Sequence, residues 1–234
     1  MSVRVEDVWV KTDQYKSDLE FVNHFELTDD IGEFFQSGFI DFTARIYSND
    51  FYPVTGDPRQ SSCLEIGYGA GRLLNAASRY FKEVVGVDIH ESKERTEKLL
   101  LENGCENFNL LQKEETHTIP DKSIKFAFSF IVFQHFTTWS EVESYLQLLD
   151  RVIADDGCGI LYFGMNNRSP GLPYVESGEF FPEARGYSLV VQPQYAVDEI
   201  NKRFDVFEAN IGPKYPWTTD GQQSSQFYVK FKRK

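Results

Sequence analysis

Short apolar runs of strand length alternate along the chain with segments whose apolar residues recur at helical spacing. The expected strands cover about 62–66, 84–88, 107–112, 124–132 and 158–164, and the expected helices between them cover about 70–81, 91–102 and 139–153. The run over 124–132 is apolar at most positions, which is typical of a strand buried on both faces. This alternation predicts an α/β fold with a mostly parallel sheet and helices on both faces.

The first 60 residues precede this alternation and are rich in aromatic side chains. Apolar residues at helical spacing predict one amphipathic helix here, with an N-cap within 28–30. The apolar positions of this helix are Ile31, Phe34, Phe35, Phe39, Phe42 and Ile46. We expect residues 1–60 to form a helical cap or lid, and residues 61–234 to form the main domain.

Residues 165–194 interrupt the alternation with prolines, glycines and little periodicity. A stretch of this length inside a compact domain is usually functional, so we expect an inserted loop that walls a substrate pocket. Its candidate wall residues are Tyr174, Glu176, Glu179, Phe180, Phe181, Arg185 and Tyr187. A short helix at about 195–202 and two strands at about 204–210 and 225–232 are expected to follow.

Three alternating glycines, Gly67, Gly69 and Gly71, follow the first expected strand. Glycine allows positive φ in a tight turn and lets a ligand approach the main chain. The exposed N–H groups of the helix that begins there suit polar or anionic ligand atoms. The next strand ends in Asp88, about 20 residues after the first glycine, where doubly wound folds place an acid that binds ribose hydroxyls.

The spacing of the glycines separates two classes of cofactor. The dinucleotide fingerprint G-x-G-x-x-G would require glycine at position 72, which is Arg72. The chain reads instead E-x-G-x-G-x-G from Glu65, and together with Asp88 this resembles the class I S-adenosylmethionine (SAM)-dependent methyltransferases. The resemblance implies a doubly wound, seven-stranded, mostly parallel sheet with the last strand antiparallel, and SAM as the cofactor.

The resemblance also implies roles for residues near the glycines. Gly67, Gly69 and Gly71 would lie beside the methionine part and the ribose of SAM, and Asp88 would accept hydrogen bonds from both ribose hydroxyls. Ile89 would pack on the adenine. Glu65 would steady the loop or reach the amino acid end of the ligand.

Other expected cofactor contacts come from three separate segments. Residues 115–120 fit the frame D-A-x-x-L-P that many relatives show, which places Glu115 and Thr116 at the adenine edge, with Glu114 as the alternative acid. Gln134, which follows the fourth strand, would contact SAM. Tyr15 is the aromatic residue that we select as a contact from the lid.

His135 is the candidate general base, because residues after the fourth strand lie between methyl donor and acceptor in the resembled family. A histidine that titrates near pH 6.5 can accept a proton at neutral pH. The alternative role for His135 is structural, with its ring bonded to the neighbouring loop. We expect an O-methyltransferase acting on a small molecule or a sugar.

Two alternatives to oxygen methylation stay open. An N-methyltransferase would attract an amine cation with acids such as Glu176 or Glu179. A nucleotide-binding protein without catalysis, or a dinucleotide-dependent enzyme, would use the same fold for another purpose.

Composition narrows the partners. The chain has 234 residues and a formal net charge of −12, which argues against nucleic acid as a partner. No apolar run approaches the roughly 20 residues needed to cross a bilayer, so no membrane partner is expected.

Cys63, Cys105 and Cys158 are widely spaced and are expected to be reduced, buried thiols without a metal. The first residues lack signal-peptide order, and we expect a cytoplasmic protein.

Overall fold

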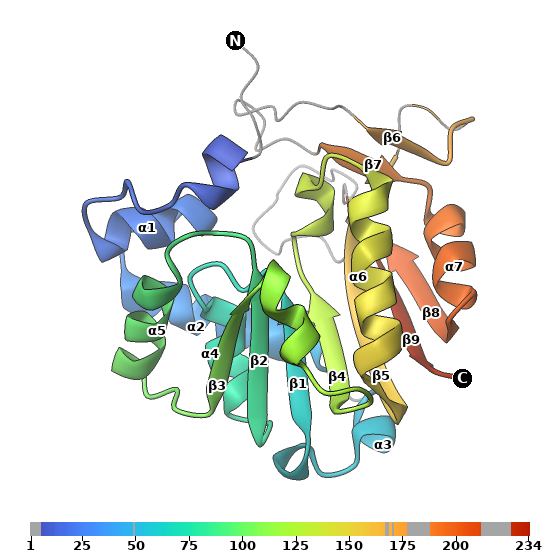
Figure 1. Cartoon of the computed structure of the whole chain (residues 1–234), viewed down its shortest axis with the longest axis horizontal. Helices are drawn as coiled ribbons and strands as arrows, with labels where there is room; N and C mark the ends of the chain where they lie inside the picture. The colour runs from blue at the N-terminus through green and yellow to red at the C-terminus, as the bar shows by residue number, and fades with distance from the viewer. Residues whose placement is uncertain (1–5, 49, 167–168, 170, 177–187, 212–225) are drawn as a thin grey trace.

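The computed structural model describes residues 6–48, 50–166, 169, 171–176, 188–211 and 226–234 (Figure 1). Its centre is a seven-stranded sheet with the strand order β3-β2-β1-β4-β5-β9-β8. The strands are β1 (Ser62–Ile66), β2 (Glu83–Asp88), β3 (Phe108–Gln112), β4 (Ile124–Ser129), β5 (Ile153–Gly164), β8 (Phe204–Ile211) and β9 (Gln226–Arg233). The first five strands pair in parallel, and β9 is antiparallel to both of its neighbours. This arrangement confirms the predicted fold class.

Helices cover both faces of the sheet. They are α4 (Arg72–Ser78), α5 (Lys93–Glu102), α6 (Trp139–Val152) and α7 (Pro193–Asn201). Successive residues of β1 point to opposite faces, so that Cys63 joins a core cluster with α4 and α5, whereas Leu64 joins a second cluster with α6 and α7. Three short 3₁₀ turns complete this part of the chain, η3 (Pro58–Gln60), η4 (Lys113–Thr118) and η5 (Phe133–His135).

The N-terminal part folds as a series of short helical segments, which we call the cap. These segments are η1 (Glu6–Val10), α1 (Asp18–Phe25), α2 (Ile31–Asp41), η2 (Phe42–Ile46) and α3 (Tyr52–Thr55). The expected helix begins as predicted, because the Asp30 side chain accepts a hydrogen bond from the Glu33 N–H at 2.9 Å. Its last turn, η2, widens into a π-helix. The sequence analysis did not predict α1 or α3.

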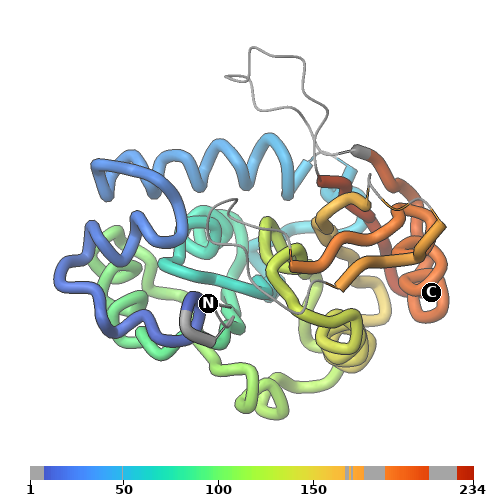
Figure 2. Tube along the Cα trace, turned by 90° about the horizontal axis from the view of Figure 1, so that it is seen from above, coloured from blue at the N-terminus to red at the C-terminus, as the bar shows by residue number. Residues whose placement is uncertain are grey.

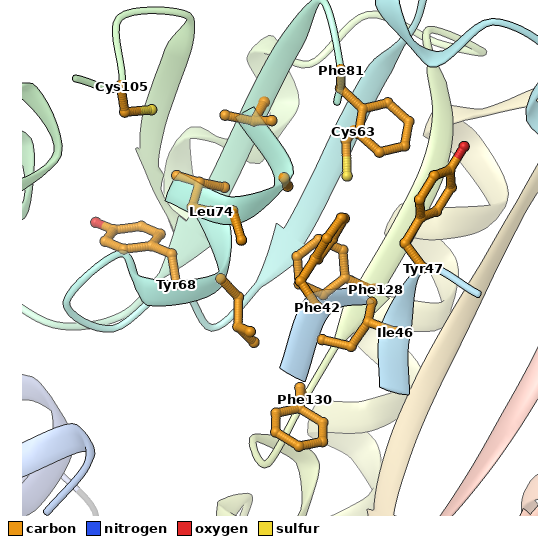
Figure 3. Packing of buried hydrophobic residues seen from close by; sticks show 14 of the residues in the cluster. Phe42, Ile46, Tyr47, Cys63, Tyr68, Leu74, Phe81, Cys105, Phe128 and Phe130 are labelled. Atoms are coloured by element: carbon orange, nitrogen blue, oxygen red, sulfur yellow. The ribbon is translucent and has the colours of Figure 1, made fainter. Parts of the chain in front are cut away.

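The cap shares a hydrophobic core with one face of the sheet. Phe42, Ile46 and Tyr47 lie in one buried cluster with Cys63 and Phe128 (Figure 3). Seen from above, α1 (dark blue) lies at the end of the molecule opposite β8 and β9 (red) (Figure 2). The later part of the cap reaches the other strands, since the Tyr162 hydroxyl of β5 donates to the Arg45 carbonyl and α3 packs on β5.

Three boundaries differ from the expected ones. β4 ends at Ser129 instead of 132, because Ile131 adopts a positive φ of 60°, which an extended strand does not allow. β5 begins at Ile153 instead of 158, and its pairing with β4 shifts register between Ile124 and Phe126. Within the expected loop, β6 (Tyr174–Glu176) pairs antiparallel with β7 (Leu189–Val191).

Cys63, Cys105 and Cys158 are free and buried, as predicted. Among the helices of the described residues, we find none that is both long enough and apolar enough to span a membrane.

Candidate active site

A cavity lies at the carboxyl ends of β1, β2 and β4, next to the cap. The strand order reverses between β1 and β4, and in open α/β sheets ligands bind at such a switch point. The predicted site residues that line the cavity are Glu65, Gly67, Gly69, Asp88, Ile89 and His135. These six come from the ends of three neighbouring strands, so the sheet brings together the core of the expected site.

The glycine loop, residues 67–71, joins β1 to α4 in a conformation that requires glycine. Gly67, Gly69 and Gly71 have φ values of 82°, 50° and 87°. A Cβ atom on Gly67 would lie 2.3 Å from Val132 Cγ2, and one on Gly69 would lie 2.8 Å from Phe25 Cδ1. The loop is therefore held between the segment after β4 and the cap, and Gly67 and Gly69 line the cavity.

Gly71 does not line the cavity, which differs from its predicted role as a cofactor contact. It is the N-cap residue of α4, and a Cβ atom there would lie 2.9 Å from Leu100 Cδ2 in α5. Its physical role in the structure is to let two helices approach each other closely.

Asp88 ties the end of β2 to the glycine loop. Its Oδ2 accepts a hydrogen bond from the Gly69 N–H at 2.8 Å, and its Oδ1 accepts one from the Ile89 N–H at 2.7 Å. The side chain is half-buried and lines the cavity. Each carboxylate oxygen has more than one lone pair, so Asp88 can also accept hydrogen bonds from a pair of ribose hydroxyls.

Glu65 is the second carboxylate of the cavity, and it is 2% exposed. Its Oε2 is buried and has no hydrogen-bond partner among the described residues. Burial raises the pKa of Glu65 well above its ordinary value, an effect that nearby Arg72 opposes and Asp88 strengthens. A buried acceptor of this kind requires a donor, and the ammonium group of SAM is a cationic donor. Glu65 and Asp88, which line the cavity beside the glycine loop, thus fit the polar groups of SAM.

Arg72, the residue that distinguishes this motif from a dinucleotide fingerprint, lines the cavity and faces the cap. Its Nε lies 3.0 Å from Glu26 Oε2, and its Nη1 lies 2.5 Å from Asp41 Oδ2. The sequence analysis assigned Arg72 no partner. Both partners lie in the cap, over 30 residues away in sequence.

The segment after β4 places His135 at the cavity and turns Gln134 away from it. Gln134 is 5% exposed, and its Oε1 accepts a hydrogen bond from Gln226 Nε2 of β9 at 2.5 Å. The Gln134 side chain thus faces β9 and does not line the cavity, where its contact with SAM was predicted. Gln134 Nε2 lies 3.3 Å from His135 Nε2, and the ring of Trp9 lies 4.8 Å from the His135 ring.

Ile131 combines two features that rarely occur together, a β-branched side chain and a positive φ. It lines the cavity next to Phe130 and Val132. Such strained backbone costs on the order of 1–3 kcal/mol and clusters at functional sites. The sequence shows no signal of this conformation.

The expected acid at the adenine edge does not line the cavity. Glu115 Oε2 accepts a hydrogen bond from the Gln112 N–H at 2.7 Å and lies 3.5 Å from Lys93 Nζ, and both contacts lower the pKa of Glu115. Thr116 Oγ1 donates to the Lys113 carbonyl, and Glu114 is exposed. Capping of η4 thus uses the side chains that we assigned to adenine, and Lys113 lines the cavity in their place.

Tyr15 is also absent from the cavity wall. Its hydroxyl lies 2.8 Å from His24 Nδ1 within the cap. The rings that the cap contributes to the cavity are Trp9, Phe25 and Phe34, which the sequence analysis did not single out. The abundance of aromatic residues in the cap was the one available signal for them.

The expected substrate loop is described in part. The Tyr174 ring stacks on Trp139 at 5.9 Å, and Glu176 Oε1 accepts a hydrogen bond from the Trp139 N–H at 2.7 Å, so both side chains pack at the start of α6. Neither lines the cavity. The other candidate wall residues, Glu179, Phe180, Phe181, Arg185 and Tyr187, lie outside the described residues.

Comparison with known proteins agrees with this geometry. Residues 64–161 match the family model described as a methyltransferase domain. No curated protein sequence matches the chain. Among solved structures, a SAM-dependent methyltransferase from Aquifex aeolicus is similar, with a TM-score of 0.57, 17% identity, and coverage of 88% of this chain and all of that chain.

Two other solved structures are similar. One is a SAM-dependent methyltransferase from Methanosarcina mazei, with a TM-score of 0.57, 16% identity, and coverage of 80% of this chain and 98% of that chain. The other is the N-methyltransferase NodS from Bradyrhizobium japonicum in complex with S-adenosyl-L-homocysteine, with a TM-score of 0.54, 10% identity, and coverage of 86% and 98%. At these identities the likeness shows the shared fold.

The sheet order, the antiparallel β9 and the glycine-loop site together define the fold of the class I methyltransferases. The family match adds the identity of the domain, since it covers the glycine loop, Asp88 and the segment after β4. Residues 64–161 thus match a methyltransferase domain, and the chain has the fold of S-adenosylmethionine-dependent methyltransferases.

Proposed function

We propose that this methyltransferase transfers the methyl group of SAM to an oxygen atom of a small molecule or a sugar, with His135 as the general base. The observation that carries the proposal is that His135 lines the same cavity as Glu65, Gly67 and Asp88. This supports the proposal, because the candidate proton acceptor lines the same cavity as the residues that we expect to bind the methyl donor.

The chemistry requires little from the protein beyond positioning and one proton transfer. Bound SAM supplies a methyl group on a cationic sulfur. The chain holds the donor with the glycine loop and Asp88, and the Phe25 ring packs against Gly69 and excludes water from the loop. A hydroxyl group is a poor nucleophile until its proton begins to leave, which is the task of His135.

The side-chain amide of Gln134 contacts Nε2 of the His135 ring. Gln226 Nε2 donates to Gln134 Oε1, so the amide nitrogen of Gln134 faces the imidazole at 3.3 Å. An amide N–H donates and does not accept, so it suits a ring nitrogen that carries a lone pair. Because this contact engages the lone pair, an acceptor hydroxyl would have to displace the Gln134 amide before it gave its proton to Nε2.

Methylation of an amine has less support. That alternative predicted that acids such as Glu176 or Glu179 would attract a cationic substrate, and Glu179 lies outside the described residues. The Glu176 carboxylate instead accepts a hydrogen bond from the Trp139 N–H at the start of α6, so we favour oxygen as the acceptor atom.

The direct test is His135→Ala. Loss of a general base typically lowers a rate by 10²–10⁴-fold, so we expect kcat to fall at least about 100-fold, while the Kd for SAM measured by calorimetry stays within about threefold. His117→Ala is the matched control, because His117 is exposed and does not line the cavity. A decrease in kcat of less than about threefold in His135→Ala would exclude the base role.

A second measurement separates a base from a structural histidine. An acceptor whose hydroxyl has a lower pKa depends less on a general base. The kcat for such an acceptor should therefore fall less in His135→Ala than the kcat for an acceptor of higher pKa. An equal loss for all acceptors would assign His135 to ordering the loop.

A further inference from the structure

Gly69, in the middle of the glycine loop, has both its N–H and its carbonyl held by side chains from outside the loop. The N–H donates to Asp88 Oδ2 at 2.8 Å. The carbonyl oxygen accepts one hydrogen bond from His90 Nε2 and another from Thr96 Oγ1, each at 2.9 Å. Three side chains, from the end of β2, the segment after it and α5, therefore fix one residue that lines the cavity.

The glycine loop needs such support because its glycines have no side chains that could pack against neighbours. Glycine loses more conformational freedom on ordering than any other residue. A loop that is already held in its bound conformation does not lose this freedom again when a ligand arrives, so the ligand binds more tightly. The groups that fix Gly69 should therefore raise the affinity of the cavity for its cofactor.

Both ring nitrogens of His90 make hydrogen bonds, and together these define one tautomer. The Ser92 N–H donates to His90 Nδ1 at 3.2 Å, so Nδ1 carries a lone pair. The Gly69 carbonyl oxygen has no hydrogen to donate, so Nε2 carries the proton. The neutral imidazole with its proton on Nε2 is the form that satisfies both contacts.

The His90 ring is completely buried between the cap and the glycine loop. The centroids of the Phe21 and Phe25 rings of α1 lie 5.9 and 5.5 Å from its own, and that of the Tyr68 ring lies 5.0 Å away. The His90 carbonyl accepts a hydrogen bond from Gln112 Nε2, at the end of β3, at 2.8 Å. The ring therefore has little freedom to turn, and its N–H stays directed at the loop.

From these contacts we propose that His90 is a positioning residue for cofactor binding, whose neutral imidazole holds the Gly69 carbonyl and keeps the glycine loop in the conformation that binds SAM. His90 does not line the described cavity, so it acts through Gly69. The proposal depends on SAM as the cofactor, and it holds whether the methyl acceptor is oxygen or nitrogen.

Two conservative substitutions separate the two nitrogens of the ring. The asparagine amide lies near the position of Nδ1 and the glutamine amide near that of Nε2, because the two side chains differ by one CH₂ group. His90→Asn therefore loses the donor to Gly69, whereas His90→Gln keeps one. For the full chain, we expect the Kd for SAM measured by calorimetry to rise about 3- to 12-fold in His90→Asn, as for loss of one hydrogen bond, and less than about twofold in His90→Gln.

Thermal unfolding shows whether the two variants of His90 are equally well folded, and their Tm values should agree within about 4 °C. The matched controls are His117→Asn and His117→Gln, because His117 is exposed and does not line the cavity. A Kd in His90→Asn equal to that of the wild type would overturn the positioning role. An equal rise in both variants would also overturn it, because lost ring packing would then be the cause.

Thr96→Val tests the same carbonyl without changing His90. Valine keeps the size of the side chain and removes the hydroxyl that donates to Gly69, so we expect the Kd for SAM to rise about 3- to 12-fold here as well. An unchanged Kd would mean that the Gly69 carbonyl does not control cofactor affinity, which would overturn the proposal. Wild-type protein that bound no SAM would instead overturn the cofactor assignment itself, whereas methylation of nitrogen would leave the role of His90 standing.

Discussion

The glycine loop and the cap both line the cavity, but they contribute different kinds of atoms. The loop presents main chain from Gly67 and Gly69, supported by the carboxylate of Asp88. The cap presents side-chain rings from three separate helical segments. Main chain held by a strand and a helix has little freedom, which suits a cofactor that is always the same. Side chains can change without disturbing the sheet, which suits the part of the site that selects an acceptor.

The comparison predicts that substitutions in the loop weaken SAM binding and lower the stability of the fold. Substitutions in the cap should instead change the KM for the acceptor. Three substitutions on the cofactor side test the comparison, and they are ordered here by the size of the expected effect.

Gly67→Ala should have the largest effect. Alanine at φ 82° costs about 1–2 kcal/mol for its backbone, and its Cβ would lie 2.3 Å from Val132 Cγ2. We expect a total loss of roughly 2–4 kcal/mol and a Tm lower by about 4–16 °C, at about 2–4 °C per kcal/mol for a chain of this size, together with loss of SAM binding. Thermal unfolding and calorimetry measure both.

Gly171→Ala is the control for this substitution, because a Cβ atom on Gly171 meets nothing within 4 Å. If Gly67→Ala kept the wild-type Tm and the wild-type Kd for SAM, the loop would not be the rigid side of the cavity.

Asp88→Asn should have an intermediate effect that is confined to the cofactor. The substitution replaces one acceptor oxygen with an N–H group, which would face the N–H of either Gly69 or Ile89. Hydrogen bonds to a charged group contribute about 1.5–3 kcal/mol each, so we expect the Kd for SAM to rise about 100-fold. The KM for the acceptor at saturating SAM should change less than about threefold.

The control for Asp88→Asn is Asp205→Asn, on an exposed position of β8. A large rise in the acceptor KM with an unchanged Kd for SAM would reverse the roles that we assign to the two sides of the cavity.

Glu65→Gln should have the smallest effect, and its sign depends on pH. Burial raises the pKa of Glu65 in the folded state, so between the unfolded and folded pKa values the folded protein binds more protons. The free energy of unfolding therefore falls as pH rises through this window. Glutamine does not ionise, and we expect the variant without SAM to be more stable than wild type at about pH 8, by about 2–4 °C in Tm if the gain is about 1 kcal/mol. The difference should shrink toward about pH 5.

Saturating SAM should stabilise the wild type more than Glu65→Gln, since the variant cannot pair a charge with the ammonium group. Glu106→Gln, at an exposed position, controls for loss of one negative charge. A variant that is less stable than wild type at every pH would mean that the Glu65 carboxylate already has a partner in the folded protein.

The sequence alone determined the sheet and the group of residues at the centre of the cavity. Apolar runs separated by helical segments specify a parallel sheet, because strands buried on both faces need helices as covers. The positive φ values at Gly67, Gly69 and Gly71 and the contact of Asp88 with the loop follow from a motif within 25 residues. Local sequence is sufficient there because the backbone conformation itself excludes other residues.

Only the tertiary structure decided where the remaining side chains point. Gln134 faces away from the cavity because its partner, Gln226, is 92 positions away in sequence. Glu115 caps η4, and Tyr15 contacts His24, whereas Trp9 reaches the cavity. Each of these residue types is able to contact a cofactor. Whether its side chain lines the cavity depended on which distant residue came within hydrogen-bond or ring-packing distance. A pattern along the chain records periodicity and backbone freedom, but it does not record those partners.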